Sequence, residues 1–372
     1  MKLDGVRVLD LSLFLPGPML TLMMADHGAE VIKVEPAGEG EPTRHVGYRT
    51  GVESVWFRNT HRGKSSIQLN LKDPADHAVF MALAAEADVV IEAFRPGVAA
   101  RLGVDYEAVR AVNPGVVYCA ISAFGQDGPY RDRPAHDVAV QALAGVVALN
   151  EGQDGLPAMP AMPVADALAS LTALSGVLMA LLRKRETGLG DYLDVAMFDS
   201  VLAWTPNVTG RIFATGEAHV VKDERSWGGN AMYGLYRTAD DRWLALGGAE
   251  VKFARNLLTP LGRADLVPLA ELPPGPGQEP LRAFLREAFL GRKLAEWEVW
   301  FVDRDVCWAP VRTLKEAFAD PALVARGMLG RDADGHEVVG TPIRFREEPA
   351  AISPAVPVLD GQGAEIRARL RP

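Results

Sequence analysis

Asp166 has the clearest potential for nucleophilic chemistry, because it lies where an extended apolar segment meets a helix-like one. The segment before it reads LPAMPAMPVA, and the run after it reads ALASLTALSGVLMALL. A carboxylate at such a position often only caps the helix by accepting hydrogen bonds from its free N–H groups. A carboxylate held beside an apolar channel also suits a nucleophile, or an acid or base. The residue alone leaves both interpretations open.

His136 and Glu250 are two further candidates, each at the predicted start of a helix. His136 follows the loop GQDGPYRDRPA, which itself follows the strand-like run VVYCAIS. Its imidazole could transfer protons near neutral pH, or it could only bond a backbone carbonyl group. Glu250, in LALGGAEVKF, lies in the first turn of a predicted helix, where a carboxylate commonly interacts with the helix dipole. Neither residue is persuasive by itself.

The elements that must position these residues alternate between strand and helix patterns in the first half of the chain. Strand-like runs occupy residues 6–12, 29–35, 66–71, 88–94 and 116–122, and helix patterns occupy residues 17–28 and 74–86. Repeated β–α–β units predict a parallel sheet with helices on both faces, and therefore an α/β fold. Ligands of such sheets bind at the carboxyl ends of the strands, where the loop beginning at Gly125 lies.

The second half predicts a smaller α+β domain. A helix over residues 166–186 and a strand–helix segment ending at residue 213 precede a polar linker at 214–227. The runs MYGLYRT and RWLALGGA around Ala239-Asp240-Asp241 predict a hairpin. We expect the first part of a large domain at 1–213, the small domain at 228–318, and a return to the large domain at 319–372.

Composition places the chain among soluble globular proteins. Its 372 residues are 48% hydrophobic, and the formal net charge of −9 argues against nucleic acid as a partner, because phosphates need a basic face. Cys119 and Cys307 indicate a reducing compartment, and Asp4 and Arg7 occupy positions where a signal peptide would be apolar. No uninterrupted apolar run approaches about 18 residues, so we expect no membrane span. A cytoplasmic location is the expectation that follows.

Common cofactor and hydrolase motifs do not occur in the sequence. LSLFLPGP occupies the turn after the first strand, where a dinucleotide-binding site would carry GxGxxG. There is no Walker loop, HExxH or GxSxG motif. The seven histidines are not paired at a metal-binding spacing, so we expect neither a metal ion nor a permanently bound cofactor.

Six segments, in order between Leu3 and Ser200, carry a family resemblance that covers essentially the whole chain. They read LDGVRVLDLS followed by GP, GAEVIKVE, NTHRGKSSIQLNLK, ADVVIEAFRPGVAARLG, GQDGPYRDRPAHD and TGLGDYLDVAMFDS. With them the chain resembles the family III CoA-transferases (the CaiB/BaiF family), which also includes the α-methylacyl-CoA racemases. The resemblance implies a Rossmann-like large domain, a small domain, and a homodimer whose two subunits interlock as rings.

The resemblance also implies a role for Asp166. In the transferases the matching aspartate attacks an acyl-CoA thioester, forming an aspartyl-acyl anhydride and then an aspartyl-CoA thioester. A weak carboxylate nucleophile gains from being held beside the bound thioester. The developing oxyanion needs backbone N–H donors, for which Gly228-Gly229 and Gly247-Gly248 are candidates. Transfer of CoA from an acyl-CoA to a carboxylic acid is therefore the first functional prediction.

Epimerisation of a 2-methylacyl-CoA is the second prediction. His136, Asp166 and Glu250 match the three positions that work together in the racemases, with His and Asp as acid and base and Glu250 orienting His136. Ala169-Ser170 and Val251 depart from the racemase pattern, and most family members are transferases, so transfer is placed first. A CoA-binding paralogue without catalysis is the third possibility.

CoA itself needs cations for its phosphates and an apolar slot for its adenine. The positions that match CoA contacts of the family are Lys64, Lys72, Phe94, Arg95 and Arg101. The ordinary alternative for each Lys or Arg is a solvated surface residue. Many relatives carry Arg just after the Glu of GAEVIKVE, where this chain has Pro36-Ala37, so its contacts to the adenine end of CoA are expected to differ.

Overall fold

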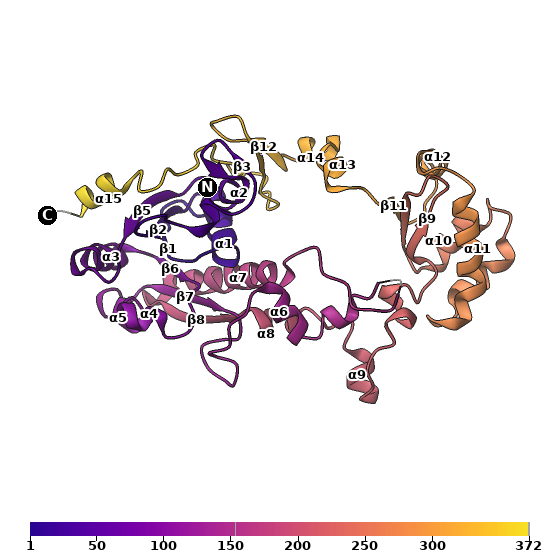
Figure 1. Cartoon of the computed structure of the whole chain (residues 1–372), viewed down its shortest axis with the longest axis horizontal. Helices are drawn as coiled ribbons and strands as arrows, with labels where there is room; N and C mark the ends of the chain where they lie inside the picture. The colour runs from indigo at the N-terminus through magenta and orange to yellow at the C-terminus, as the bar shows by residue number, and fades with distance from the viewer. Residues whose placement is uncertain (153, 371–372) are drawn as a thin grey trace. The chain divides into compact units, whose positions relative to one another are not determined.

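The structure, a computed structural model, describes residues 1–152 and 154–370 and divides the chain into two compact units (Figure 1). Unit 1 contains residues 1–144, 161–205 and those from 320 onward, and unit 2 contains residues 145–160 and 206–319. The division differs from the predicted boundaries, because residues 145–160 and 206–213, the predicted linker at 214–227, and Ala319 all belong to unit 2. The chain therefore passes from unit 1 to unit 2 and back twice.

Unit 1 is built on a parallel six-stranded sheet with the strand order β5-β2-β1-β6-β7-β8. Its strands are β1 (Arg7–Asp10), β2 (Glu30–Pro36), β5 (Ser65–Leu69), β6 (Val89–Glu92), β7 (Val117–Ser122) and β8 (Asp191–Ala196). Every residue of β6 and β7 is buried, as the strands of a sheet covered on both faces require. The predicted α/β fold with a parallel sheet is confirmed.

The direction of strand addition reverses between β1 and β6. From β1 the chain continues to β2 and β5 on one side, and it then crosses to β6, β7 and β8 on the other. The loops that leave the carboxyl ends of β1 and β6 therefore diverge. In open α/β sheets this is the place where ligands bind.

Helices cover the sheet of unit 1. They are α1 (Pro16–Asp26), α2 (Val55–His61), α3 (Pro74–Glu86), α4 (Val98–Leu102), α5 (Tyr106–Val112), α6 (Asp137–Leu143), α7 (Val164–Thr187), α8 (Met197–Ala203), α14 (Pro321–Ala325) and α15 (Gly363–Arg369). Short pieces complete the unit: the 3-10 helix Pro42–Arg44, β3 (Arg49–Thr50), β4 (Glu53–Ser54), β12 (Leu329–Arg331) and β13 (Glu337–Val339). Phe80 of α3 and Val109 of α5 pack with Leu9 and Val90 in one buried cluster. α1 and α7 lie side by side (Figure 1).

α7 is 24 residues long and is apolar enough, by length and composition, to cross a membrane. The sequence expectation considered only uninterrupted apolar runs, and it did not single this helix out. One such helix is weak evidence, because core helices of soluble proteins have the same property. Ala165, Ala169 and Ala173, spaced one turn apart, are completely buried where α7 packs within unit 1.

Unit 2 contains a three-stranded antiparallel sheet with the order β11-β10-β9 and several helices. The elements are β9 (Tyr233–Arg237), β10 (Trp243–Gly247), β11 (Trp308–Pro310), α9 (Gly210–Thr215), α10 (Val251–Leu258), α11 (Glu279–Leu290), α12 (Leu294–Phe301) and α13 (Leu314–Phe318). Its 3-10 segments are Val147–Leu149, Val221–Asp223, Arg225–Trp227, Ala264–Glu271 and Pro276–Gln278. β9 and β10 form the predicted hairpin, and Phe289, Trp297 and Phe301 lie in the core.

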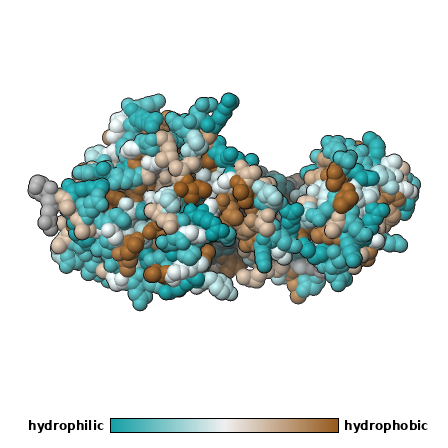
Figure 2. Space-filling model, turned by 90° about the horizontal axis from the view of Figure 1, so that it is seen from above, coloured by the Kyte–Doolittle hydropathy of each residue, from teal (hydrophilic) through white to brown (hydrophobic). Residues whose placement is uncertain are grey.

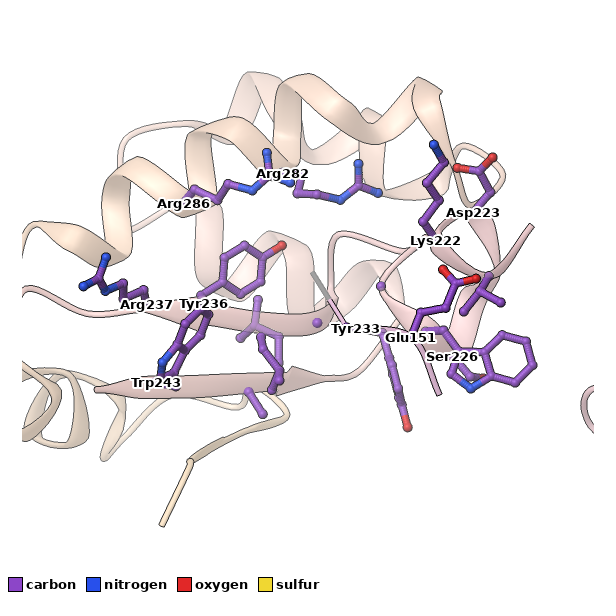
Figure 3. Close-up of a pocket in the computed structure, with 18 of the residues that line it drawn as sticks. Glu151, Lys222, Asp223, Ser226, Tyr233, Tyr236, Arg237, Trp243, Arg282 and Arg286 are labelled. Carbon is purple, nitrogen blue, oxygen red and sulfur yellow. The ribbon is translucent and has the colours of Figure 1, made fainter. Parts of the chain in front are cut away.

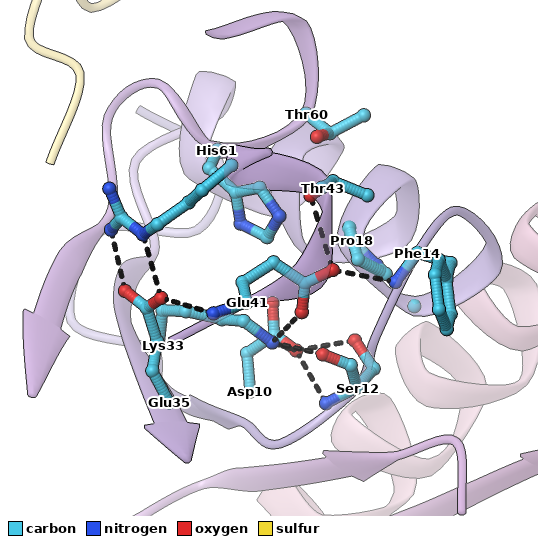
Figure 4. A network of polar contacts seen from close by, with 12 residues as sticks. Asp10, Ser12, Phe14, Pro18, Lys33, Glu35, Glu41, Thr43, Thr60 and His61 are labelled. Atoms are coloured by element: carbon cyan, nitrogen blue, oxygen red, sulfur yellow. Dashed lines mark hydrogen bonds and ion pairs between the residues drawn. The ribbon is translucent and has the colours of Figure 1, made fainter. Parts of the chain in front are cut away.

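A buried ion network lies beneath the loop of residues 12–18 in unit 1 (Figure 4). Its charged members are Asp10, Glu35 and Glu41, which are acidic, and Lys33, Arg44 and Lys64, which are basic. Lys64 Nζ is 3.1 Å from Asp10 Oδ2, and Lys33 Nζ is 3.7 Å from Glu41 Oε2. Each carboxylate has a cationic neighbour, so the network keeps buried charges compensated.

Candidate active site

The predicted catalytic residues of unit 1 lie at the carboxyl edge of the parallel sheet. β7 ends at Ser122 and continues into the loop that leads to His136. α7 begins at the same edge, because it runs antiparallel to β8, the strand that follows it. Asp166 lies in the first turn of α7.

Asp137, and not Asp166, accepts the free N–H groups at the start of α7. Asp137 Oδ1 is 2.7 Å from the backbone nitrogen of Ala165 and 3.2 Å from that of Asp166. Asp137 Oδ2 accepts a hydrogen bond of 2.6 Å from Gln141 Nε2. The Asp166 carboxyl group is consequently not used for capping, and it has no hydrogen bond or ion pair within residues 1–152 and 154–370.

The surroundings of Asp166 favour its protonated form. The side chain is half-buried. Burial raises the pKa of Asp166, and the nearby Asp137 carboxylate raises it further, to about 7. Near neutral pH the group is therefore present in both forms, which suits a nucleophile or a proton-transfer group.

His136 precedes α6, and its exposed ring does not cap that helix. The ring instead lies edge-on to the ring of Phe14, with 5.9 Å between the centroids and 83° between the planes. The next residue, Asp137, binds the backbone of Asp166. The structure therefore brings His136 and Asp166 to the same corner of unit 1.

Glu250 belongs to unit 2, whereas His136 and Asp166 belong to unit 1. It immediately precedes α10, so it is one residue outside the helix whose first turn it was predicted to occupy. Its side chain is exposed and does not cap α10. The proposed orientation of His136 by Glu250 stays a prediction.

Exposed cations lie on segments that follow β5, β6 and β7. Lys72 follows β5, Arg95 follows β6, and Arg101 is in α4. Gly97 has a φ of +80°, and a Cβ atom there would lie 3.6 Å from Arg101 Nη1 and 3.4 Å from Arg131 Nη2. Two guanidinium groups therefore flank one glycine at the carboxyl edge, a suitable arrangement for a phosphate group.

Phe94 is fixed at the end of β6, beside the exposed Arg95. Its N–H group donates a hydrogen bond of 2.6 Å to Glu92 Oε2, and its ring packs against the core. Burial raises the pKa of Glu92 to about 7. The partly buried Phe94 ring offers apolar surface at the end of β6, as a nucleotide slot needs.

Lys64 has a different role from the predicted phosphate contact. Its ammonium group has no exposed surface and donates hydrogen bonds to Asp10 Oδ2, the carbonyl oxygen of Pro18 and Thr21 Oγ1, at 3.1, 3.0 and 2.8 Å. Burial lowers the pKa of Lys64 to about 8, although Asp10 opposes this effect. A phosphate contact needs an exposed ammonium group, so Lys64 is a structural residue of the buried network.

Two of the four glycine N–H groups considered as oxyanion donors are already used inside unit 2. The N–H group of Gly229 donates to the carbonyl oxygen of Glu224 at 3.0 Å, and that of Gly247 donates to the carbonyl oxygen of Cys307 at 2.9 Å. These two donors are therefore not available to a substrate.

Unit 2 contains a cavity of about 1290 Å³ (Figure 3). Tyr236 and Trp243 contribute aromatic surface to it, and Arg282 and Arg286 line it as well. Both arginines contact Glu279, which reduces the positive charge available to an anion. None of the predicted catalytic residues lines this cavity.

Sequence analysis did not single out Asp137 or Arg131. Asp137 binds the backbone of residues 28 and 29 positions later in the chain, a distance at which no local pattern reveals the contact. Arg131 is one of several charged residues in GQDGPYRDRPAHD, and only the fold brings it to Gly97. The position of Asp137 in the first turn of a helix, after a strand-end loop, could have marked it as a candidate in the sequence.

Comparisons with known proteins agree with this arrangement. The model of CoA-transferase family III matches residues 3–363. The chain is 33% identical to acetyl-CoA:oxalate CoA-transferase of Acetobacter aceti, a match that covers 98% of this chain and 94% of that protein. It is 32% identical to succinyl-CoA–D-citramalate CoA-transferase of Chloroflexus aurantiacus, over 98% of this chain and 92% of that protein. A solved CaiB/BaiF family protein of Brucella suis has a TM-score of 0.87 and 30% identity, with 99% of each chain covered.

A parallel α/β sheet in a chain that matches this family along its length is the framework of an acyl-CoA enzyme. The chain belongs to CoA-transferase family III, and it is an enzyme of that family.

Proposed function

We propose that this enzyme moves CoA from an acyl-CoA to a carboxylic acid, with Asp166 as the nucleophile. The free, half-buried Asp166 carboxyl group carries the proposal, because the fold uses it neither for capping nor for an ion pair within the described residues. A raised pKa makes the ionised form more basic, and therefore more nucleophilic, than an ordinary carboxylate. The names of the two relatives, both CoA-transferases, support the same reaction.

The reaction proceeds through two kinds of covalent species on Asp166. An Asp166 oxygen attacks the thioester carbonyl, the carbon–sulfur bond breaks, and a mixed anhydride and the CoA thiolate result. The thiolate attacks the aspartyl carbonyl, which gives an aspartyl-CoA thioester and releases the donor acid. The acceptor carboxylate then attacks the aspartyl carbonyl of this thioester, so the carbon–sulfur bond breaks, the CoA thiolate leaves and a second anhydride forms. The thiolate attacks the acyl carbonyl of this anhydride, and the bond between that carbon and the Asp166 oxygen breaks. A new acyl-CoA leaves, Asp166 is regenerated, and no proton is consumed.

Asp137 acts as a positioning residue in this scheme. Its carboxylate holds the backbone of Ala165 and Asp166, so the first turn of α7 is fixed. Its charge also keeps the pKa of Asp166 high, after the larger effect of burial. A fixed nucleophile loses little freedom on reaching the thioester carbon.

We further propose that Lys72, Arg95, Arg101 and Arg131 bind the phosphates of CoA and that Phe94 contacts its adenine. All four cations lie on segments that follow strands at the carboxyl edge of the sheet. CoA and its thioesters would then be substrates, with no permanently bound cofactor.

We also propose a cytoplasmic homodimer. Four apolar side chains of α7 are exposed, namely Leu171 at 44%, Leu178 at 40%, Met179 at 70% and Leu182 at 66%. Apolar patches interrupt the polar surface in Figure 2, and such patches often mark interfaces. Light scattering after gel filtration should give the mass of two chains, and a monomer at micromolar concentration would reject the dimer.

Racemisation is the second candidate, favoured by the exposed His136 imidazole close to an acid with a pKa of about 7. The test is incubation of a 2-methylacyl-CoA in deuterated water, with and without an acceptor acid. Transfer predicts a new acyl-CoA only with the acceptor and no deuterium at the α-carbon. Deuterium at that carbon without an acceptor would instead establish racemisation, with Glu250 as the residue that orients His136. If neither reaction is observed, the third alternative remains, a CoA-binding protein without catalysis.

A further inference from the structure

Phe14 has a backbone conformation that bulky residues rarely adopt. Its φ is +64°, in the left-handed region, where Cβ approaches a carbonyl oxygen too closely. The other non-glycine residues of the described chain with positive φ are Asp241 and Asp360. Aspartate tolerates this conformation in turns, whereas phenylalanine does not. Such a residue persists only where its surroundings impose it, and these residues cluster at functional sites.

The buried ion network imposes this conformation (Figure 4). The N–H group of Phe14 donates a hydrogen bond of 2.9 Å to Oε1 of the buried Glu41. Oε2 of Glu41 lies 3.7 Å from Lys33 Nζ, and the same ammonium group donates to the carbonyl oxygen of Ser12. A Cβ atom on Gly17 would overlap the Ser12 side chain, so the loop closes on itself tightly. Both sides of Phe14 are therefore held by one network.

The same loop is bound to the elements that carry His136 and Asp166. Ser170, one turn after Asp166 in α7, donates a hydrogen bond of 2.6 Å to the carbonyl oxygen of Pro16. The Phe14 ring makes its edge-on contact with the His136 ring. Phe14 itself keeps 36% of its surface exposed. An accessible aromatic ring is thus fixed between two segments of the candidate active site.

We propose that Phe14 is a specificity-determining residue, whose ring forms with the His136 imidazole the wall that receives the acyl group beside Asp166. The exposed part of the ring offers apolar surface to an acyl chain, and its edge contact restricts the imidazole. Glu41 holds this wall in place through the backbone, so its position does not depend on side-chain packing alone. The proposal rests on the proposed function, because it assumes an acyl-CoA at Asp166.

Three variants separate the ring from the strained backbone. Phe14→Gly removes the ring and also relaxes the positive φ, so it should not lower thermal stability. Phe14→Tyr keeps a ring and should retain the wild-type preference. Asp241→Gly relaxes a positive φ in the β9–β10 hairpin of unit 2, outside the loop of residues 12–18, and is the matched control.

The first readout is the ratio of kcat/KM for 2-methylpropanoyl-CoA to that for acetyl-CoA, with one acceptor acid. Removal of the wall should raise this ratio by about tenfold or more in Phe14→Gly, because a pocket discriminates by the volume it leaves. The ratio should stay at the wild-type value in Phe14→Tyr and Asp241→Gly. An equal loss of kcat/KM for both substrates in Phe14→Gly would overturn the proposal, since it indicates a structural role only.

The second readout requires no turnover, so it tests the wall even if the protein does not transfer CoA. It is the Hε1 proton signal of His136, assigned with His136→Asn. The signal should move in Phe14→Gly, because the ring current is lost, and acetyl-CoA should perturb it in the wild type. An unmoved signal in Phe14→Gly, or no effect of acetyl-CoA on the wild type, would overturn the proposal whether or not the protein transfers CoA.

Discussion

Asp10 and Asp166 both lie near the carboxyl edge of the sheet of unit 1, at the end of β1 and in the first turn of α7. Their electrostatic surroundings are opposite. Asp10 is the last residue of β1 and faces the ammonium groups of Lys33 and Lys64, at 3.5 and 3.1 Å. Burial alone would raise the pKa of Asp10, but the two cations hold it well below its ordinary value of 3.8. Burial also raises the pKa of Asp166, and there the neighbour, Asp137, is another carboxylate, so the pKa reaches about 7.

The difference shows how one residue type becomes structural or reactive. A carboxylate paired with cations and hydrogen-bond donors is stabilised as an anion, and it has little tendency to form a new bond. A carboxylate without such partners keeps its basicity. Holding it ionised in a half-buried position lowers the stability of the fold.

The largest expected effect belongs to Asp166→Asn, which should reduce CoA transfer by at least about 10³-fold. The amide cannot form the anhydride, whereas the fold loses nothing, because no described residue pairs with the carboxyl group. In the wild type the raised pKa means that stability falls as pH rises from about 3.8 towards about 7. Asp166→Asn removes this penalty, so at pH 8 its thermal midpoint should equal or exceed that of the wild type. A variant that is unstable at pH 8 would contradict this account.

Asp10→Asn should have the opposite profile, with a loss of about 3–5 kcal/mol in the free energy of unfolding. The change leaves Lys33 and Lys64 buried without their shared counter-charge. Because the pKa of Asp10 is depressed, its contribution is present above pH 3.8 and is lost as the pH falls further. Urea unfolding at pH 7 measures the loss. Asp4→Asn, at an exposed ion pair, is the control and should cost about 0–1 kcal/mol.

Arg101→Ala should raise the KM for acyl-CoA by about tenfold with little change in kcat, because a charge-assisted contact to phosphate is lost. The effect should weaken at high salt, where such contacts are screened. Arg183→Ala, at an exposed pair with Glu186 on α7, is the matched control. Equal KM values for the two variants would remove Arg101 from the proposed CoA contacts.

The smallest expected effect belongs to Asp137→Asn, which keeps an acceptor for the N–H group of Ala165 but removes the charge that faces Asp166. The pKa of Asp166 should fall, so the rising limb of kcat/KM, expected near pH 7 in the wild type, should move to lower pH. Asp73→Asn changes the cap of α3 in the same way and should leave the limb in place. A limb that does not move in Asp137→Asn would show that another group controls it.

The sheet and the place of the site could be predicted from the sequence because they depend on local patterns. Apolar runs of four to six residues predict buried parallel strands. Asp166 and His136 were recognised as candidates because each lies where a helix-like run begins. The hairpin around Asp240 was equally local.

What could not be predicted depends on contacts between distant positions. Lys64 belongs to a sequence, HRGKSS, that is typical of a surface loop, and only its contact with Asp10, 54 residues earlier, shows that it is buried. The pairing of Asp137 with the backbone of Asp166 and the strained backbone of Phe14 have the same origin. The assignment of residues 145–160 to unit 2 also reflects tertiary contacts rather than composition.

The most direct test of the central claim is a search for CoA bound covalently to Asp166. The protein would be incubated with acetyl-CoA, treated with borohydride or hydroxylamine, digested, and examined by mass spectrometry. We expect the peptide that contains Asp166 to carry the reduced or hydroxamate form in the wild type, and Asp166→Asn to carry neither. Rapid CoA transfer with an unmodified Asp166 peptide, or modification at another carboxylate, would contradict the account.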